Sequence, residues 1–384
     1  MNLYRRFLPD LLVYVAPVFV IFAQIPYFRG NIVSRVFSFV GLFLALLYIL
    51  IKRIRVDLSK YTTILVLTVV LLLFSVTCCI LTGESFYFST TITSILITVA
   101  TFIVFSVIFS SSKTTVNLSI FIEFIILSIS ILSIFIFVFL INQGFSFFGR
   151  YYYYGESKNL VAFIVAFGSI LQLMMLKYKK LRLLHLLEFL FCSYVEIMLK
   201  SRTSLICWIV GVFLVVLLFF KNHKIKIIFL ASVIIFLIVV LTVKPVYELV
   251  VNNIFAAGRN LNDLNDLTSG RMVGFLLSYR LFESSPFIGV GNNYIDNNIL
   301  MWLSQHGVIG FLIIVSIAIC LISKIRLCYA RDFKIMLAII FIMLLVNGLM
   351  ESYSPFGPGT KVFCCWALLA ACENYKIQDL SKGF

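Results

Sequence analysis

Arg271 is the residue of this sequence best placed to bind a phosphate. It follows Thr268-Ser269-Gly270, in the first turn of a helix predicted to begin at Thr268 or Ser269 and to end at Glu283. Backbone N–H groups and the helix dipole attract anions there, and a guanidinium beside them suits a phosphate or pyrophosphate. Arg280 would project roughly opposite Arg271, so one straight helix cannot aim both at the same phosphate. The alternative is an interfacial amphipathic helix with Arg280 at lipid head groups.

Arg202 and Glu196 form a second candidate pair. Arg202 belongs to the run Lys200-Ser201-Arg202-Thr203, at the mouth of two predicted apolar spans, and Glu196 lies inside the first of these spans. A carboxylate inside a membrane span is costly and usually faces a polar cavity or a cation. We therefore expect both side chains to line one cavity, although a structural ion pair that orders the bundle is an equally open reading.

Asp296 and His306 are candidates for a general base. Both lie near the start of a predicted span that opens with Leu300-Met301-Trp302. Either group could remove a proton from a sugar hydroxyl, Asp by positioning and His by its intrinsic pKa. The alternatives are that Asp296 caps the span helix and that His306 makes an interhelical hydrogen bond.

A tyrosine-rich loop could contact a saccharide. Residues 142–159 carry Arg150 and the run Tyr151-Tyr152-Tyr153-Tyr154, in which we assign Tyr152 and Tyr154 to glycan contact. Tyrosine offers an apolar ring and a polar hydroxyl, which suits stacking on a sugar. Tyrosine is equally typical of the belt at a membrane interface, so that reading stays open.

The elements that must position these residues are apolar spans. The 384 residues are 62% hydrophobic and 12% charged, with a mean hydropathy of +1.10, which excludes a water-soluble globule. The sequence predicts an all-α integral membrane protein with about 12 transmembrane helices in a single polytopic domain, residues 1–384. The spans are predicted near residues 11–28, 36–51, 61–81, 90–109, 118–141, 158–176, 181–199, 203–220, 225–243, 298–323, 333–349 and 359–375.

The basic residues predict the orientation of the chain. Most of the 31 Lys and Arg residues fall in the connections on the side of the N-terminus, which places both termini in the cytoplasm. The net charge of +15 therefore indicates membrane orientation and not a nucleic-acid partner. One long connection, residues 244–297, lies on the outer side with short helices, and long connections are usually functional. The nine cysteines lie mostly in apolar runs without a CxxC pair, and no metal or cofactor motif is present.

Four motifs around this connection resemble the O-antigen ligase and polymerase family, the Wzy-type proteins. They are Ser201-Arg202, Ser269-Gly270-Arg271, Ser285-Pro286-Phe287-Ile288-Gly289-Val290-Gly291 and the segment Leu300 to Gly310. The resemblance covers about residues 195–320, which we take as the O-antigen ligase-like core.

The resemblance implies a substrate and a chemistry. It implies a donor glycan linked to undecaprenyl pyrophosphate, transferred without a metal or cofactor at the outer face of the bacterial cytoplasmic membrane to a sugar hydroxyl of a second lipid-linked unit. Arg202 and Arg271 would hold the pyrophosphate, with Arg259 and Arg280 as further candidates. A flippase and a chain-length regulator are the implied protein partners.

One position distinguishes the members of this family. Ligase-type members carry a histidine before the asparagine that follows the glycine-rich turn, and this chain has Asp296 before Asn297. The departure favours a capsular or exopolysaccharide polymerase in which Asp296 is the base and Asn297 contacts the glycan. His306 and Glu196 are the alternative candidates for the base. The alternatives are an O-antigen ligase with another acceptor, and a flippase for lipid-linked oligosaccharide, which could also have 12 spans.

Overall fold

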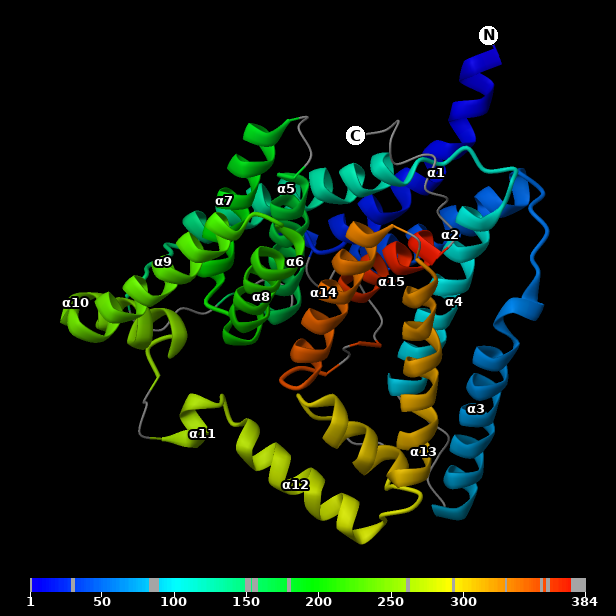
Figure 1. Ribbon diagram of the computed structural model, residues 1–384. Coiled ribbons are helices and arrows are strands. Elements are labelled where there is room, and N and C mark those ends of the chain that lie inside the picture. The colour runs from blue at the N-terminus through cyan, green and yellow to red at the C-terminus, as the bar shows by residue number, and fades with distance from the viewer. Residues whose placement is uncertain are drawn as a thin grey trace.

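The computed structural model shows an all-helical architecture over the part of the chain that it describes (Figure 1). The described residues are 2–28, 32–82, 90–148, 153, 158–177, 181–259, 263–291, 294–328, 330–352, 355–356 and 360–373. Within these ranges the chain forms helices and turns and no strand.

The helices follow the apolar runs of the sequence. In chain order they are α1 (Asn2–Phe22), α2 (Ile32–Ile51), α3 (Thr62–Thr82), α4 (Thr90–Ser110), α5 (Leu118–Asn142), α6 (Lys158–Met175), α7 (Arg182–Leu199), α8 (Arg202–Leu214), α9 (His223–Thr242), α10 (Lys244–Tyr247), α11 (Leu264–Leu267), α12 (Arg271–Ser284), α13 (Asn298–Ser323), α14 (Arg331–Gly348) and α15 (Thr360–Glu373). Two π-helical segments, Val215–Phe219 and Glu248–Phe255, continue α8 and α10.

Eight of the described helices are long and apolar enough to cross a membrane, which supports a membrane-embedded helical protein. They are α2, α3, α4, α5, α6, α8 with its π-helical extension, α9 and α13. Helices also occupy the other four predicted stretches, as α1, α7, α14 and α15. Helices α7 and α14 each carry three Lys, Arg, Asp or Glu residues, and the apolar parts of α1 and α15 are shorter. The count of twelve spans therefore stays a prediction.

The core lies around α15, which packs against α4 and also contacts α1, α6 and α14. Trp366 of α15 is fully buried, stacks on Phe356 and donates its indole N–H to the Pro355 carbonyl over 2.8 Å. Helix α9, by contrast, is almost entirely exposed along an apolar surface. An apolar face of this size is what a lipid environment covers.

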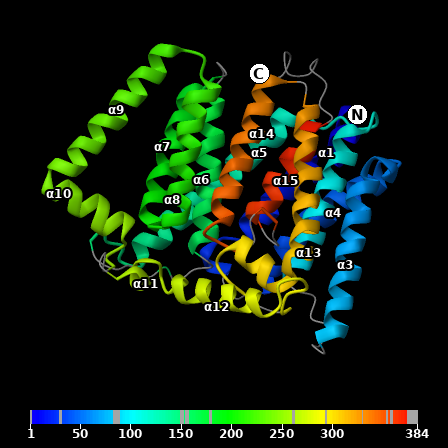
Figure 2. The same cartoon turned by 60° about the horizontal axis from the view of Figure 1, so that its bottom comes forward.

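Helix α12 runs across one end of the bundle, below the ends of α6, α8 and α14 (Figure 2). We refer to this end as the site end. The prediction that α12 begins at Thr268 or Ser269 is wrong, because the helix begins at Arg271 after Gly270, which has φ 80° and provides no side-chain cap. Ser269 cannot cap the helix because its own φ is 63° and its hydroxyl accepts hydrogen bonds from two arginines.

Helix α13 is interrupted at Gly307, and the glycine-rich segment 285–291 forms hydrogen bonds with the backbone groups that lose their helical partners there. Gly307 has φ 61° and ψ −170°, so the carbonyls before it and the N–H groups after it lose their helical partners. Val290 N–H and Gly291 N–H donate to the Ser304 and Gln305 carbonyls over 2.8 and 3.1 Å, and Val308 N–H donates to the Pro286 carbonyl over 2.8 Å. Non-helical backbone is tolerated in a membrane protein where the chain itself supplies these bonds.

Alanine at Gly307 is expected to lower the free energy of unfolding by roughly 3 kcal/mol, because the residue is in the left-handed region and its backbone closely approaches another segment. A Cβ at Gly307 would lie 2.3 Å from the Phe287 carbonyl. Thermal melting of the detergent-solubilised protein measures the loss. Gly274 of α12 is the matched control, because no atom lies within 4 Å of a Cβ built there. Equal melting temperatures of the Gly307→Ala and Gly274→Ala proteins would contradict the close approach of the backbone at Gly307.

Candidate functional site

Glu351 is the centre of a polar network at the site end. It follows α14 and is only 8% exposed. Its Oε1 accepts hydrogen bonds from Arg271 Nη2, from Asn159 Nδ2 over 2.6 Å and from Thr203 Oγ1 over 3.2 Å. These donors come from α12, α6 and α8, so one carboxylate ties three helices together. A buried carboxylate with three donors is strongly held in place.

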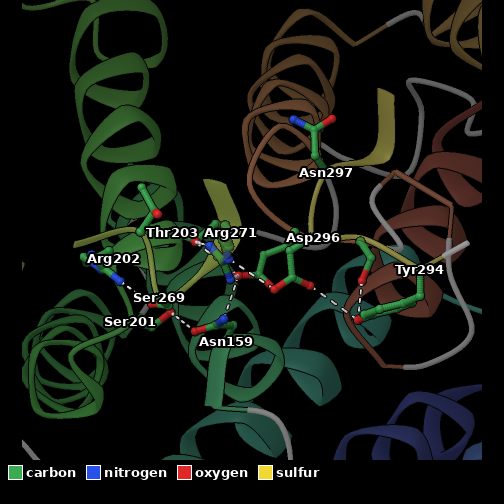
Figure 3. A network of polar contacts seen from close by, with 12 residues as sticks. Asn159, Ser201, Arg202, Thr203, Ser269, Arg271, Tyr294, Asp296 and Asn297 are labelled. Atoms are coloured by element: carbon green, nitrogen blue, oxygen red, sulfur yellow. Dashed lines mark hydrogen bonds and ion pairs between the residues drawn. The ribbon is translucent and has the colours of Figure 1, made fainter. Parts of the chain in front are cut away.

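Arg271 lies between two carboxylates. Its Nη2 contacts Glu351, and its Nε lies 3.1 Å from Asp296 Oδ2 (Figure 3). Burial alone lowers the pKa of Arg271, but the attraction of Glu351 and Asp296 outweighs burial, so the pKa is raised above its ordinary value. The guanidinium charge is therefore already neutralised by the protein, and Arg271 positions the two acids.

Asp296 presents its second oxygen toward Tyr294. The Tyr294 hydroxyl lies 3.4 Å from Asp296 Oδ1 and 2.7 Å from Ser352 Oγ (Figure 3). The side chain of Asp296 is 32% exposed, so a hydroxyl from solution can reach it. The alternative that Asp296 caps α13 is wrong, because Asn297 is the cap residue and its side chain accepts the Leu300 N–H over 3.0 Å. The amide of Asn297 also donates to the Leu349 carbonyl, so both of its polar ends have partners in the protein.

A cation cluster of Lys158, Arg202 and Arg259 adjoins this network. Arg202 Nη2 donates to Ser269 Oγ over 2.6 Å (Figure 3). Arg259 Nη1 donates to the same oxygen. Lys158 lies close enough to both guanidinium groups for their charges to repel, and Arg202 and Arg271 also repel. In the described ranges no carboxylate lies within ion-pair distance of Arg202 or Arg259. Asp266 attracts Arg202 and Glu351 attracts Lys158, both from beyond ion-pair distance. Unlike Arg271, the three cations of the cluster therefore retain positive charge that an anionic ligand can neutralise.

The turn between α7 and α8 positions Arg202. Lys200 is in the left-handed region at φ 48° and donates its Nζ to the Phe147 carbonyl over 2.8 Å. Burial lowers the pKa of Lys200. The Ser201 hydroxyl lies 2.9 Å from Asn159 Oδ1, so α8 begins without a side-chain cap and Arg202 stands at its first turn.

The structure brings together only some of the sequence-predicted residues. Arg202, Arg259, Arg271 and Asp296 meet at the site end, with Asn297 beside them. Arg280 is exposed on α12 outside the network. Glu196 is fully buried in α7, and neither of its carboxyl oxygens has a hydrogen-bond partner among the described residues. The expectation that Glu196 and Arg202 line one cavity therefore stays a prediction.

The remaining predictions concern the α13 break and the tyrosine loop. His306 is buried in α13 beside the break, where the backbone of segment 285–291 approaches it. Arg150, Tyr152 and Tyr154 lie outside the described residues.

Sequence reasoning missed several members of the site. They are Lys158, Asn159, Thr203, Tyr294 and Glu351. One usable signal is that polar residues stand at the ends of otherwise apolar spans, as Lys158 and Asn159 do at the start of α6 and Glu351 does after α14. Among the described residues no group of three His, Cys, Asp or Glu side chains could hold a metal ion.

A scan against protein-family models finds no match for this sequence, and a search of curated proteins finds no relative.

Proposed function

We propose that this protein is a membrane glycosyltransferase that polymerises undecaprenyl-pyrophosphate-linked oligosaccharide repeat units into a surface polysaccharide. The observation that carries the proposal is the adjacency of unneutralised Arg202 and Arg259 to a partly exposed carboxylate, Asp296, with Arg271 between them. A cation cluster suits a diphosphate, and a carboxylate that an incoming hydroxyl can reach suits a general base.

The geometry favours different roles for the arginines from those that the sequence motifs imply, in which Arg202 and Arg271 hold the pyrophosphate. Arg202 and Arg259, with Lys158, bind the leaving diphosphate, because no carboxylate of the described residues lies within ion-pair distance of them. Arg271 instead orients Asp296, because both of its ion pairs are internal. Guanidinium groups aimed at a developing negative charge stabilise the transition state, and they need little reorganisation.

The reaction is a single displacement. Asp296 accepts the proton of the acceptor hydroxyl as its oxygen forms a bond to the anomeric carbon of the donor. The bond from that carbon to the diphosphate oxygen breaks, and its electron pair leaves with the diphosphate beside Arg202 and Arg259. Holding both substrates in one site supplies much of the rate enhancement.

The proposal includes a membrane arrangement. Twelve spans would place both termini in the cytoplasm and residues 244–297 outside, in the bacterial cytoplasmic membrane. Two features support it. Helices occupy all twelve stretches. Helix α12 lies at one end of the bundle (Figure 2), and Arg202 and Arg259 donate to Ser269 just before this helix. A flippase and a chain-length regulator would be its partners in the membrane.

Chain growth in detergent tests the function. Purified protein is supplied with lipid-linked repeat units from cells that lack this gene, and the products are resolved by size. We expect a ladder of longer lipid-linked glycans, with one free undecaprenyl pyrophosphate per bond formed. A flippase makes no new bond, so unchanged repeat units would refute the enzyme and favour transport.

A further inference from the structure

A second polar cavity lies at the end of the bundle opposite the site end. It has a volume of about 500 Å³ and lies between the α2–α3 connection and the end of α4. Helix α13 starts beside Asp296 and ends next to this cavity, where Lys324 Nζ lies 5.9 Å from the centre of the Tyr61 ring. The length of α13 therefore separates the cavity from the proposed active site.

The cavity walls are held by specific contacts. Helix α2 ends in a tight turn with Arg53 in the left-handed region at φ 48°, and the Arg53 carbonyl accepts a hydrogen bond from Lys113 Nζ over 2.7 Å. This bond joins the two connections that form the cavity. On the other wall, Tyr61 is buried and donates its hydroxyl to Ser106 Oγ over 2.6 Å. The cavity is thus a defined feature of the fold.

The lining carries an excess of positive charge. Arg55, Lys60 and Lys113 line it together with one acid, Asp57. The Asp57 carboxylate already has partners in the protein, because it accepts hydrogen bonds from Ser59 N over 3.1 Å and from Ser59 Oγ over 2.6 Å. These two hydrogen bonds, led by the Ser59 hydroxyl, lower the pKa of Asp57. Asp57 thus caps the short helix Leu58–Tyr61, and the nearby charge of Lys60 also lowers its pKa.

Two of the cations are available to a ligand. Arg55 and Lys60 are exposed, and within the described ranges neither makes a hydrogen bond or ion pair through its side chain. Ser110, Ser111 and Ser112 line the same cavity, and of these the Ser110 hydroxyl donates to the Val107 carbonyl over 3.3 Å. Guanidinium, ammonium and hydroxyl donors around a concave space match the oxygens of a phosphate group.

The surroundings favour a phosphate attached to acyl chains. Leu50, Ile51, Val56 and Leu58, which flank the lining residues along the chain, are between 46% and 72% exposed. Farther along α3, Val66 and Val69 are also exposed. Apolar side chains beside a basic cavity give an acyl chain a surface to cover, and a free phosphate gains nothing from that surface.

We propose that this cavity binds the phosphate group of an anionic membrane phospholipid. The lipid would seat its head group between Arg55 and Lys60 and lay its acyl chains on the exposed faces of α2 and α3. In the proposed orientation this end of the bundle faces the cytoplasmic leaflet. The site is separate from the proposed reaction, because its residues take no part in the network at the site end.

Native mass spectrometry of the full chain tests the proposal. The detergent-purified protein is titrated with phosphatidylglycerol or with phosphatidylcholine of the same acyl chains. We expect the anionic lipid to stay bound to the wild type and its Kd to rise about thirtyfold in the double variant Arg55→Ala, Lys60→Ala, because each of the two interfacial cations contributes about 1 kcal/mol. The control is Lys221→Ala, Lys224→Ala, which removes two exposed cations that do not line the cavity.

Three outcomes would overturn the proposal. They are equal retention of both lipids by the wild type, equal retention of the anionic lipid by the two double variants, and complete displacement of the lipid by millimolar inorganic phosphate, which would indicate a free-phosphate site. Thermal melting checks that the double variant is folded, and we expect no change because both side chains are exposed. Chain growth in detergent is measured on the same samples, so a failure here is distinguishable from a failure of the proposed function.

Discussion

Replacing Arg202 and Arg259 together with alanine is expected to reduce the rate of polymer formation by at least about a hundredfold, with the protein still folded. These guanidinium groups share Ser269 Oγ as an acceptor and have no carboxylate partner in the described part of the chain. Removing one preorganised donor from a developing anion typically costs a factor of 10² to 10³ in kcat. The rate is measured as chain growth of lipid-linked repeat units in detergent.

The control and the folding check use the same chain. Lys244→Ala removes an exposed cation of the 244–297 connection that lies outside the cation cluster, and it is expected to leave the rate unchanged. Because Ser269 stays in place, thermal melting should change little in the double variant. If the double variant polymerised at the wild-type rate, the diphosphate would have to bind elsewhere, and the division of work among the arginines would be wrong.

The sequence predicted the helices well, because an apolar run of about 20 residues has few alternatives to a membrane helix. Helices occupy all twelve predicted stretches. It failed at the start of α12, where Thr268 and Ser269 look like ordinary N-caps. Tertiary contacts decide where α12 begins, since the Ser269 hydroxyl accepts a hydrogen bond from Arg202, which lies 67 residues earlier in the chain.

The role of Arg271 shows what local pattern cannot reveal. A guanidinium in the first turn of a helix predicts an anion site, and the structure provides two anions of its own, Asp296 and Glu351. Glu351 lies 80 residues along the chain, at the end of a span where an acid reads as simply solvated. Spacing within one helix carries no information about such a partner. Arg202 and Arg259 were readable as cations, but their lack of carboxylate partners was not.

The glycine-rich segment gives the opposite case, in which sequence pattern and structure correspond closely. Ser285 to Gly291 and Gly307 stand out in the sequence only as short motifs. In the structure they are two halves of one feature, because the first segment supplies the backbone bonds that α13 loses at Gly307. The same feature connects α12 to α13, so it sets where Arg271 meets Asp296.

Asp296→Asn is expected to lower the rate of polymer formation by about 10² to 10⁴, the usual contribution of a positioned general base. Asparagine keeps the shape of the side chain and can still contact Tyr294, but it cannot accept the acceptor's proton. Because Arg202 and Arg259 are unchanged, binding of the lipid-linked donor should be retained. Single-turnover chain growth measures the rate, and retention of labelled donor measures binding.

Two further variants separate chemistry from positioning. Glu283→Gln neutralises an exposed acid at the end of α12, outside the network, and should polymerise at the wild-type rate. Glu351→Gln removes the charge that holds Arg271 from the other side and should weaken the placement of Asp296, with a smaller loss of rate than Asp296→Asn. If Asp296→Asn retained full activity while Glu351→Gln lost it, the base would be Glu351, and Asp296 would serve only as a partner of Arg271.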